Sequence, residues 1–312
     1  MASFRRFAWL TLAVNVVVIA WGGFVRATGS GAGCGQHWPM CNGVIVPRSP
    51  SAEMLVEYTH RLTSGIALVL VVVLVVWARR LFAQGHRARR AAAYAMAFMI
   101  VEALAGAALV LFGWVARDTS AARVWVMPIH LTNTFLLLAA ITLTAFWSEP
   151  EERHSTARSP LGAAFVAAIA GIILSGVTGA IAALGDTLFP ATSFVAGISA
   201  DVDPRSALLL RLRTLHPIVA LLAALACVAA ARSAIEKGAD DRARRAAFAL
   251  VALVVTQVLA GLVNVALLAP VWMQIVHLVL ADLTWIALVV TAAARHAPVA
   301  APASGRLRPA TA

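Results

Sequence analysis

The sequence predicts an all-α membrane protein whose eight transmembrane helices form two four-helix bundles related by a pseudo-twofold axis. Of its 312 residues, 61% are hydrophobic and only 12% are charged, and the mean hydropathy is +0.86. Such a composition is typical of a polytopic membrane protein. Apolar segments of the length needed to cross a bilayer, about 20 residues, recur along the chain. They lie near residues 7–26, 57–78, 91–112, 128–147, 161–183, 207–231, 246–268 and 274–294.

The two halves of the chain resemble each other. Leu104-Ala105-Gly106 in the third segment recurs as Leu259-Ala260-Gly261 in the seventh. Four spans per half is an even number, so both halves have the same orientation and the axis that relates them runs along the membrane normal. We therefore expect two domains, residues 1–150 with a long outer loop and residues 151–312 with a short cytoplasmic tail. Gly106 and Gly261 would let neighbouring helices approach closely.

Basic residues give the topology. Most of the 25 Lys and Arg residues lie at the N-terminus, in the loops 79–90, 148–160 and 232–245, and in the tail after residue 294. The positive-inside rule places all of these in the cytoplasm, together with both termini. The net charge of +11 is thus explained by membrane topology, and we expect membrane lipid around the chain and no nucleic acid partner. The many Ala and Arg residues suit a bacterial plasma membrane.

The three cysteines and a second outer loop are also informative. Cys34 and Cys41 in "GCGQHWPMCNG" can form a disulfide in an oxidising compartment. Cys227 lies within the sixth segment, where a lone thiol is expected to pack as a small apolar group. The loop "TLFPATSFVAG" is moderately hydrophobic, and we expect it to form a short interfacial helix.

Four histidines stand at equivalent places in the repeat. Each lies in the first few residues of an even-numbered segment, and all of these segments start on the outer side. A single histidine there would be interpreted as an interfacial anchor. Four at one depth, two in each half, instead favour axial ligation of heme iron by paired imidazoles. Zinc would need additional ligands, and none recurs in both halves. The four are His60, His130, His216 and His277.

The motif "EYTHRLTSG" places three ionisable groups on one face of the second helix, because Glu57, His60 and Arg61 are three and four positions apart. The simplest interpretation is a Glu57–Arg61 pair that neutralises itself. The repeat aligns His60 with His216 but puts Arg213 where Glu57 stands. A carboxylate in only one half suggests that the two hemes have different roles: one undergoes the reaction and the other is only bound. Arg213 and Arg61 would pair with heme propionates.

Three more polar residues lie within spans. Glu102 in the third segment aligns with Gln257 in the seventh, and both are expected to be interhelical hydrogen-bonding groups. Asn133 follows His130 by one turn and is expected to bond to a ligand or a neighbouring helix. Asp282 comes five residues after His277, so it points elsewhere, and we expect it to pair with a polar group of the bundle.

Together these features resemble the heme A synthase family. The resemblance rests on "GGFVRATGSG", "GCGQHWPMCNG", "EYTHRLTSG", the four histidines and the repeat, and covers about residues 7 to 294. It implies an integral membrane oxidoreductase that oxidises the C8 methyl group of heme O to a formyl group, giving heme A for terminal oxidases. In that comparison Glu57 is the catalytic acid, His60 and His130 flank the substrate heme, His216 and His277 ligate a heme b cofactor, and Cys34 and Cys41 are the outer cysteine pair. Unlike some family members, this chain has no second cysteine pair between its fifth and sixth segments.

The expected chemistry and partners follow from this resemblance. Converting a methyl group to an aldehyde removes four electrons, which requires a redox cofactor and an electron acceptor. Heme O synthase, the farnesyltransferase that makes heme O, and a second copy of the chain are further expected partners. The alternative is a di-heme b-type electron-transfer protein resembling quinol oxidoreductases. Such proteins usually stack hemes at different depths, whereas these four histidines share one depth. A disulfide-generating protein would need a second cysteine pair, and an inverted-repeat transporter would need an odd number of helices per repeat.

Overall fold

The computed structural model describes residues 1–149, 161–236 and 241–295. As predicted, the fold is all-α: within these ranges the only β contact is an isolated bridge between Cys41 and Val44. Eight of the described helices are long and apolar enough to cross a membrane, so the chain is an integral membrane protein. The predicted domain boundary at 150/151 and the tail after residue 295 lie outside the described ranges.

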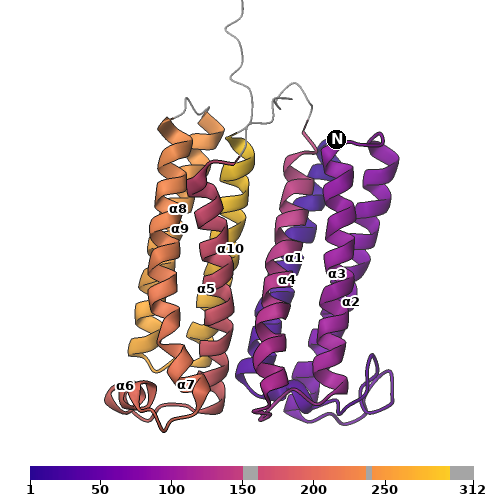
Figure 1. The fold of residues 1–312 in the computed structure, drawn as a ribbon. Coiled ribbons are helices and arrows are strands. Elements are labelled where there is room, and N and C mark those ends of the chain that lie inside the picture. Colours follow the sequence, from indigo (N-terminus) through magenta and orange to yellow (C-terminus); the bar gives the residue numbers. More distant parts are fainter. Residues whose placement is uncertain (150–160, 237–240, 296–312) are drawn as a thin grey trace, which may run out of the picture.

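The helices group as two neighbouring sets (Figure 1). The first set is α1 (Ala2–Ala27), α2 (Ala52–Leu81), α3 (Arg87–Leu111) and α4 (Ala121–Phe146). The second is α5 (Ala163–Leu188), α8 (Leu215–Glu236), α9 (Asp241–Ala266) and α10 (Val271–Ala294). We call them the N-half and the C-half. The pseudo-twofold axis between them stays a prediction.

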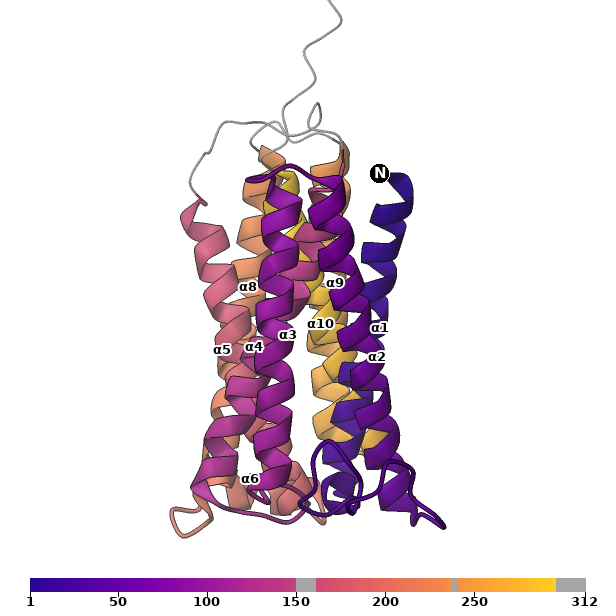
Figure 2. The same cartoon turned by 90° about the vertical axis from the view of Figure 1, so that its right-hand side faces the viewer.

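Short elements gather at one end of the molecule. The 28–51 loop with η1 (Ser30–Ala32), α6 (Phe194–Val202) and α7 (Leu208–Arg213) all lie there, as both views show (Figure 1 and Figure 2). We call it the disulfide end. The opposite end, which carries Met1 and the 82–86 turn, is called the basic end. A short helix was expected within residues 187–197; α6 begins at Phe194, inside that segment, and extends beyond it to Val202, and none of its residues is buried.

Several helices begin earlier than predicted, and two of them, α2 and α4, carry the N-half histidines. The expected starts were residues 57 and 128, but α2 begins at Ala52 and α4 at Ala121. In each case a serine caps the helix: Ser51 Oγ accepts from the Met54 amide at 3.2 Å, and Ser120 Oγ accepts from the Arg123 amide at 3.4 Å. The prediction that His60 and His130 lie in the first few residues of their helices was therefore wrong, and both lie two or more turns inside.

The sixth span is broken near its start. One helix was predicted over 207–231, but α7 ends at Arg213 and α8 begins at Leu215. Pro217 explains the break, because it has no N–H to donate to the carbonyl of Arg213 and its ring crowds that carbonyl. Before this break, α7 packs against α5 and α6 at the disulfide end.

The two halves meet along α1 and α4 on one side and α5 and α10 on the other. Trp285 of α10 donates its indole N–H to the carbonyl of Phe135 of α4 at 2.6 Å. A Cβ added to Gly176 of α5 would lie 2.6 Å from the Phe135 ring. Close packing of small residues against large ones is how membrane helices associate when no water drives them together.

Polar contacts join the halves at both ends. At the disulfide end Arg26 of α1 donates to the Ala183 carbonyl (2.7 Å), to Thr187 Oγ1 (2.7 Å) and to Gln274 Oε1 (2.8 Å). At the basic end Glu149 pairs with Arg5 at 2.7 Å and with Arg242 of α9. One cationic side chain at the disulfide end thus bridges α1, α5 and α10.

We expect Arg26→Leu to weaken the association of the halves. Three charge-assisted hydrogen bonds disappear and their acceptors stay between helices, so the loss should be about 2–3 kcal/mol. A lower midpoint of thermal unfolding in detergent would report it. Arg6→Ala, at an exposed position of the same helix, is the matched control and should change stability by no more than about 0.5 kcal/mol. Equal midpoints for the two variants would contradict this role of Arg26.

Candidate active site

Two histidines of the C-half face each other across the bundle. The rings of His216 on α8 and His277 on α10 have centroids 6.3 Å apart and planes at 88°. Two metal–nitrogen bonds of about 2.0–2.1 Å, with a ring radius of about 1 Å on each side, would place imidazole centroids roughly 6 Å apart. The separation therefore fits one metal ion held between the rings. His277 Nδ1 is buried without a hydrogen-bond partner among the described residues, and His216 Nδ1 lies 3.3 Å from Thr178 Oγ1.

A glycine on a neighbouring helix faces three of the four histidines. A Cβ on Gly179 would lie 2.9 Å from His216 Cε1, and one on Gly261 would lie 3.1 Å from His277 Cε1. In the N-half a Cβ on Gly22 would lie 2.9 Å from His60 Cε1. Any larger residue would push the imidazole aside. Gly261 was expected to allow close helix approach, whereas Gly22 and Gly179 were not predicted; both stand in the matching helices α1 and α5.

The N-half holds the second pair, His60 on α2 and His130 on α4. Glu102 Oε1 lies 3.4 Å from His130 Nδ1, without the angles of a hydrogen bond. Glu102 also accepts from Asn133 Nδ2 and Thr134 Oγ1, both at 2.6 Å. The predicted interhelical bonding of Glu102 and Asn133 is confirmed, and it fixes α3 against α4 beside His130.

Glu57 lies one turn before His60 and is only 3% exposed. Its Oε2 accepts from the Cys34 amide at 2.8 Å, and its Oε1 accepts from both Nε (3.2 Å) and Nη2 of Arg61. Arg61 Nη1 donates to the carbonyls of His37 and Met40, the latter at 2.6 Å. Cys34 and Cys41 are joined by a disulfide. The predicted Glu57–Arg61 pair exists, and it also holds the disulfide loop over the start of the N-half site.

Comparison with known proteins now decides the family. The family model described as "Cytochrome oxidase assembly protein" matches residues 5–289, which include all four histidines and Glu57. Several proteins named heme A synthase are similar to this chain. The chain belongs to the heme A synthase family.

Individual relatives match to different extents. A protoheme IX farnesyltransferase of Thermus thermophilus is 46% identical over 281 residues, covering 90% of this chain and 46% of that protein. A heme A synthase of Geobacillus kaustophilus is 34% identical over 141 residues, 45% of this chain and 42% of that protein. One of Halalkalibacterium halodurans is 38% identical over 111 residues, 36% of this chain and 37% of that protein. The matches thus span less than half the length of these relatives.

In this member of the heme A synthase family, both arginines expected beside heme propionates are engaged by other groups. Arg61 pairs with Glu57, as described above. Arg213 donates Nη1 to Asp186 Oδ1 at 2.6 Å, and its Nη2 and Nε donate to Asp201 Oδ1 at 2.5 and 2.8 Å. Arg213 thereby ties α5, α6 and α7 together at the disulfide end. Neither aspartate was singled out from the sequence, because Asp186 lies just beyond the predicted fifth span and Asp201 lies in the segment that follows it.

Asp282 departs from its prediction. Its side chain is 0% exposed, and neither carboxylate oxygen has a hydrogen-bond partner within the described residues. The expected polar partner is therefore absent from the described part of the bundle. The reason is the face of α10 on which it lies: Trp285 and Val289, three and seven residues on, pack on that face into the apolar core.

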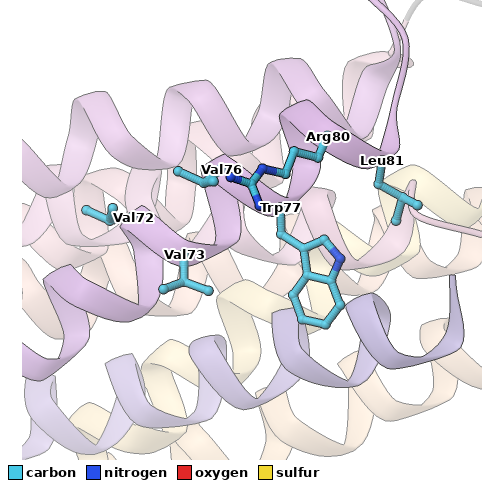
Figure 3. A pocket seen from close by; sticks show the side chains of 6 residues that line it. All are labelled: Val72, Val73, Val76, Trp77, Arg80 and Leu81. Atoms are coloured by element: carbon cyan, nitrogen blue, oxygen red, sulfur yellow. The ribbon is translucent and has the colours of Figure 1, made fainter.

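Two apolar grooves follow α2. One, of about 280 Å³, lies between α1 and α2 and is lined by Ala13, Val14, Val17, Val18, Thr63 and Ile66. The other, of about 510 Å³, lies at the basic end (Figure 3) and is lined by Val72, Val73, Val76, Trp77, Arg80 and Leu81. The Trp77 ring there packs against Phe4 and Phe7 of α1, with centroids 5.7 and 5.6 Å apart. The first groove is close to His60 and the second is far from it.

Proposed function

We propose that the protein is a heme A synthase, which oxidises the C8 methyl group of heme O to a formyl group and so makes heme A for terminal oxidases. The observation that carries the proposal is the presence of two histidine pairs, one in each half, with Glu57 buried beside only the first. Such a reaction needs one heme as substrate and a second redox group to take up electrons. Membership of the family supports the same reaction.

The C-half residues fit a resident heme b. In our proposal His216 and His277 would hold its iron, and the 6.3 Å separation of their ring centroids leaves room for a metal ion between them. Gly179 and Gly261 have no side chain, so they leave space for the two imidazole rings between the helices. Heme b, when bound, supplies one-electron redox chemistry.

The N-half residues fit the substrate heme. His60 and His130 would flank it, and the hydrogen bonds of Asn133 and Thr134 to Glu102 fix α4 against α3 beside His130. Glu57 is the group near His60 that is suited to hold or pass on protons while the methyl group is oxidised, because its carboxylate is buried and is fixed from two sides. Arg61 orients that carboxylate through the salt bridge.

Topology and partners complete the proposal. We place the protein in a bacterial plasma membrane, with the disulfide end outside and both termini in the cytoplasm. Residues 1–150 would form the substrate half and residues 151–312 the heme b half. The match to the Thermus relative named farnesyltransferase covers only 46% of that protein's length. A farnesyltransferase name on a protein that contains such a segment supports a complex between this protein and the enzyme that makes heme O.

The test is direct conversion. The purified protein, loaded with heme b in lipid nanodiscs, is incubated with heme O and an artificial electron acceptor, and the hemes are extracted and separated with mass detection. We expect a product with the mass and spectrum of the formyl heme. Unchanged heme O after prolonged incubation, with two equivalents of heme b bound, would favour the electron-transfer alternative.

A further inference from the structure

The groove between α1 and α2 ends one helical turn from Gly22 on α1 and one turn from His60 on α2. Val18, which lines it, lies one turn from Gly22, the residue that touches the His60 ring. Thr63, which lines the opposite wall, donates its hydroxyl to the carbonyls of His60 (3.0 Å) and Thr59 (2.9 Å). That hydroxyl is therefore satisfied by its own helix, and the groove needs no polar ligand. Both walls continue from His60 toward the basic end, into the apolar middle of the membrane.

The corresponding seam of the C-half is closely packed at the equivalent position. Aligning Gly22 with Gly179 and His60 with His216 puts Gly171 of α5 where Val14 stands in α1, and Ala223 of α8 where Ala67 stands in α2. A Cβ on Gly171 would lie 3.0 Å from Ala223 Cα and 3.1 Å from its Cβ. There the two helices touch at their backbones. In α1 the larger Val14 occupies this place, and the groove opens beside it.

We propose that this groove receives the farnesyl chain of the heme substrate. This deepens the proposed function and rests on it. A farnesyl chain is long, branched and apolar, so it needs an apolar channel that starts at the porphyrin and leads into the membrane. Heme b has no such chain, so the half that holds heme b needs no channel. The open seam beside His60 and the closely packed seam beside His216 match this difference between the two hemes.

The location also explains how a substrate of this kind enters. Val17 and Ile66 on the rim are exposed at 68% and 50% of their surfaces, so the groove opens sideways to lipid rather than to water. The farnesyl chain can enter between α1 and α2 from the bilayer while the porphyrin moves toward His60. The groove would then set specificity for farnesylated over unmodified heme.

Binding of two hemes to two groove variants tests this. Val14→Phe and Ala13→Phe each place a ring in the groove without touching the histidines. With the C-half already loaded with heme b, dissociation constants for heme O and for protoheme are measured at the N-half by absorbance titration. We expect the unaltered protein to prefer heme O roughly tenfold or more, and each variant to lose most of that preference while protoheme binds as before. Leu174→Phe, on the lipid-facing side of α5, is the matched control and should behave as the unaltered protein.

Three results would overturn the inference: no preference for heme O in the unaltered protein, unchanged heme O affinity in both groove variants, or an equal loss for both hemes. The last would mean that the ring disturbs His60 rather than the chain. Conversion by the unaltered protein is measured separately. Absence of the formyl product would contradict the proposed function, whereas the difference between heme O and protoheme affinities would still report on the groove.

Discussion

Glu57→Gln is expected to slow the conversion of heme O by about 10²–10⁴-fold, while both heme sites still fill. Glutamine has nearly the same shape, and its side-chain oxygen can still accept from the Cys34 amide, so the disulfide loop stays in place. What it lacks is the charge and the ability to exchange a proton. The measurement is the rate of formyl heme formation, together with the amount of each heme that is extracted from the variant.

The comparison with Glu57→Ala separates two roles of this residue. Alanine removes the acceptor of the Cys34 amide and the partner of Arg61 as well, so the loop should loosen and become easier to cleave with protease. If only proton transfer matters, the two variants should be equally slow, with heme O retained in both. Glu53→Gln, in the exposed first turn of the same helix, is the control and should convert heme O normally. A Glu57→Gln protein that makes heme A at the normal rate would refute the proposed role.

Much of the fold was predictable from local sequence. Apolar segment length gives the eight spans, since only helices satisfy backbone hydrogen bonds in lipid. The Glu57–Arg61 contact follows from a spacing of four in a helix. The four histidines could be selected because a repeat places them in matching helices. These inferences need no knowledge of how helices are rotated against one another.

Other features depend on that rotation or on loop conformation, and sequence alone does not supply them. The contact between the Cys34 amide and Glu57 requires the path of the 28–51 loop. The glycines facing the rings can be recognised only when the face of each helix is known. Arg213 was expected to meet a propionate, but it pairs with Asp186 and Asp201 because α5, α6 and α7 meet at the disulfide end. The starts of α2 and α4 were missed because the serine caps lie upstream of the apolar runs used to find the helices.

Removing either C-half histidine should empty the proposed heme b site while the N-half still binds heme. His216→Ala and His277→Ala each leave one imidazole. One histidine would hold the heme iron far less firmly than two. We expect the heme content to fall from about two per chain to about one, with loss of the low-spin absorbance of bis-histidine heme. Heme extraction and reduced-minus-oxidised spectra give both quantities without an activity assay.

A glycine variant tests the same site without replacing either proposed iron ligand. Gly261→Leu puts a branched side chain where a Cβ alone would lie 3.1 Å from His277 Cε1, so the imidazole must turn away from His216 and heme b should be lost. Gly65→Leu is the matched control, because a Cβ there meets nothing within 4 Å and its helix is exposed to lipid at that point. If Gly261→Leu and both histidine variants keep two hemes per chain, then heme b is ligated elsewhere and His216 and His277 only pack the bundle. If all three lose one heme and Gly65→Leu loses none, the spacing between these two rings is what holds the cofactor.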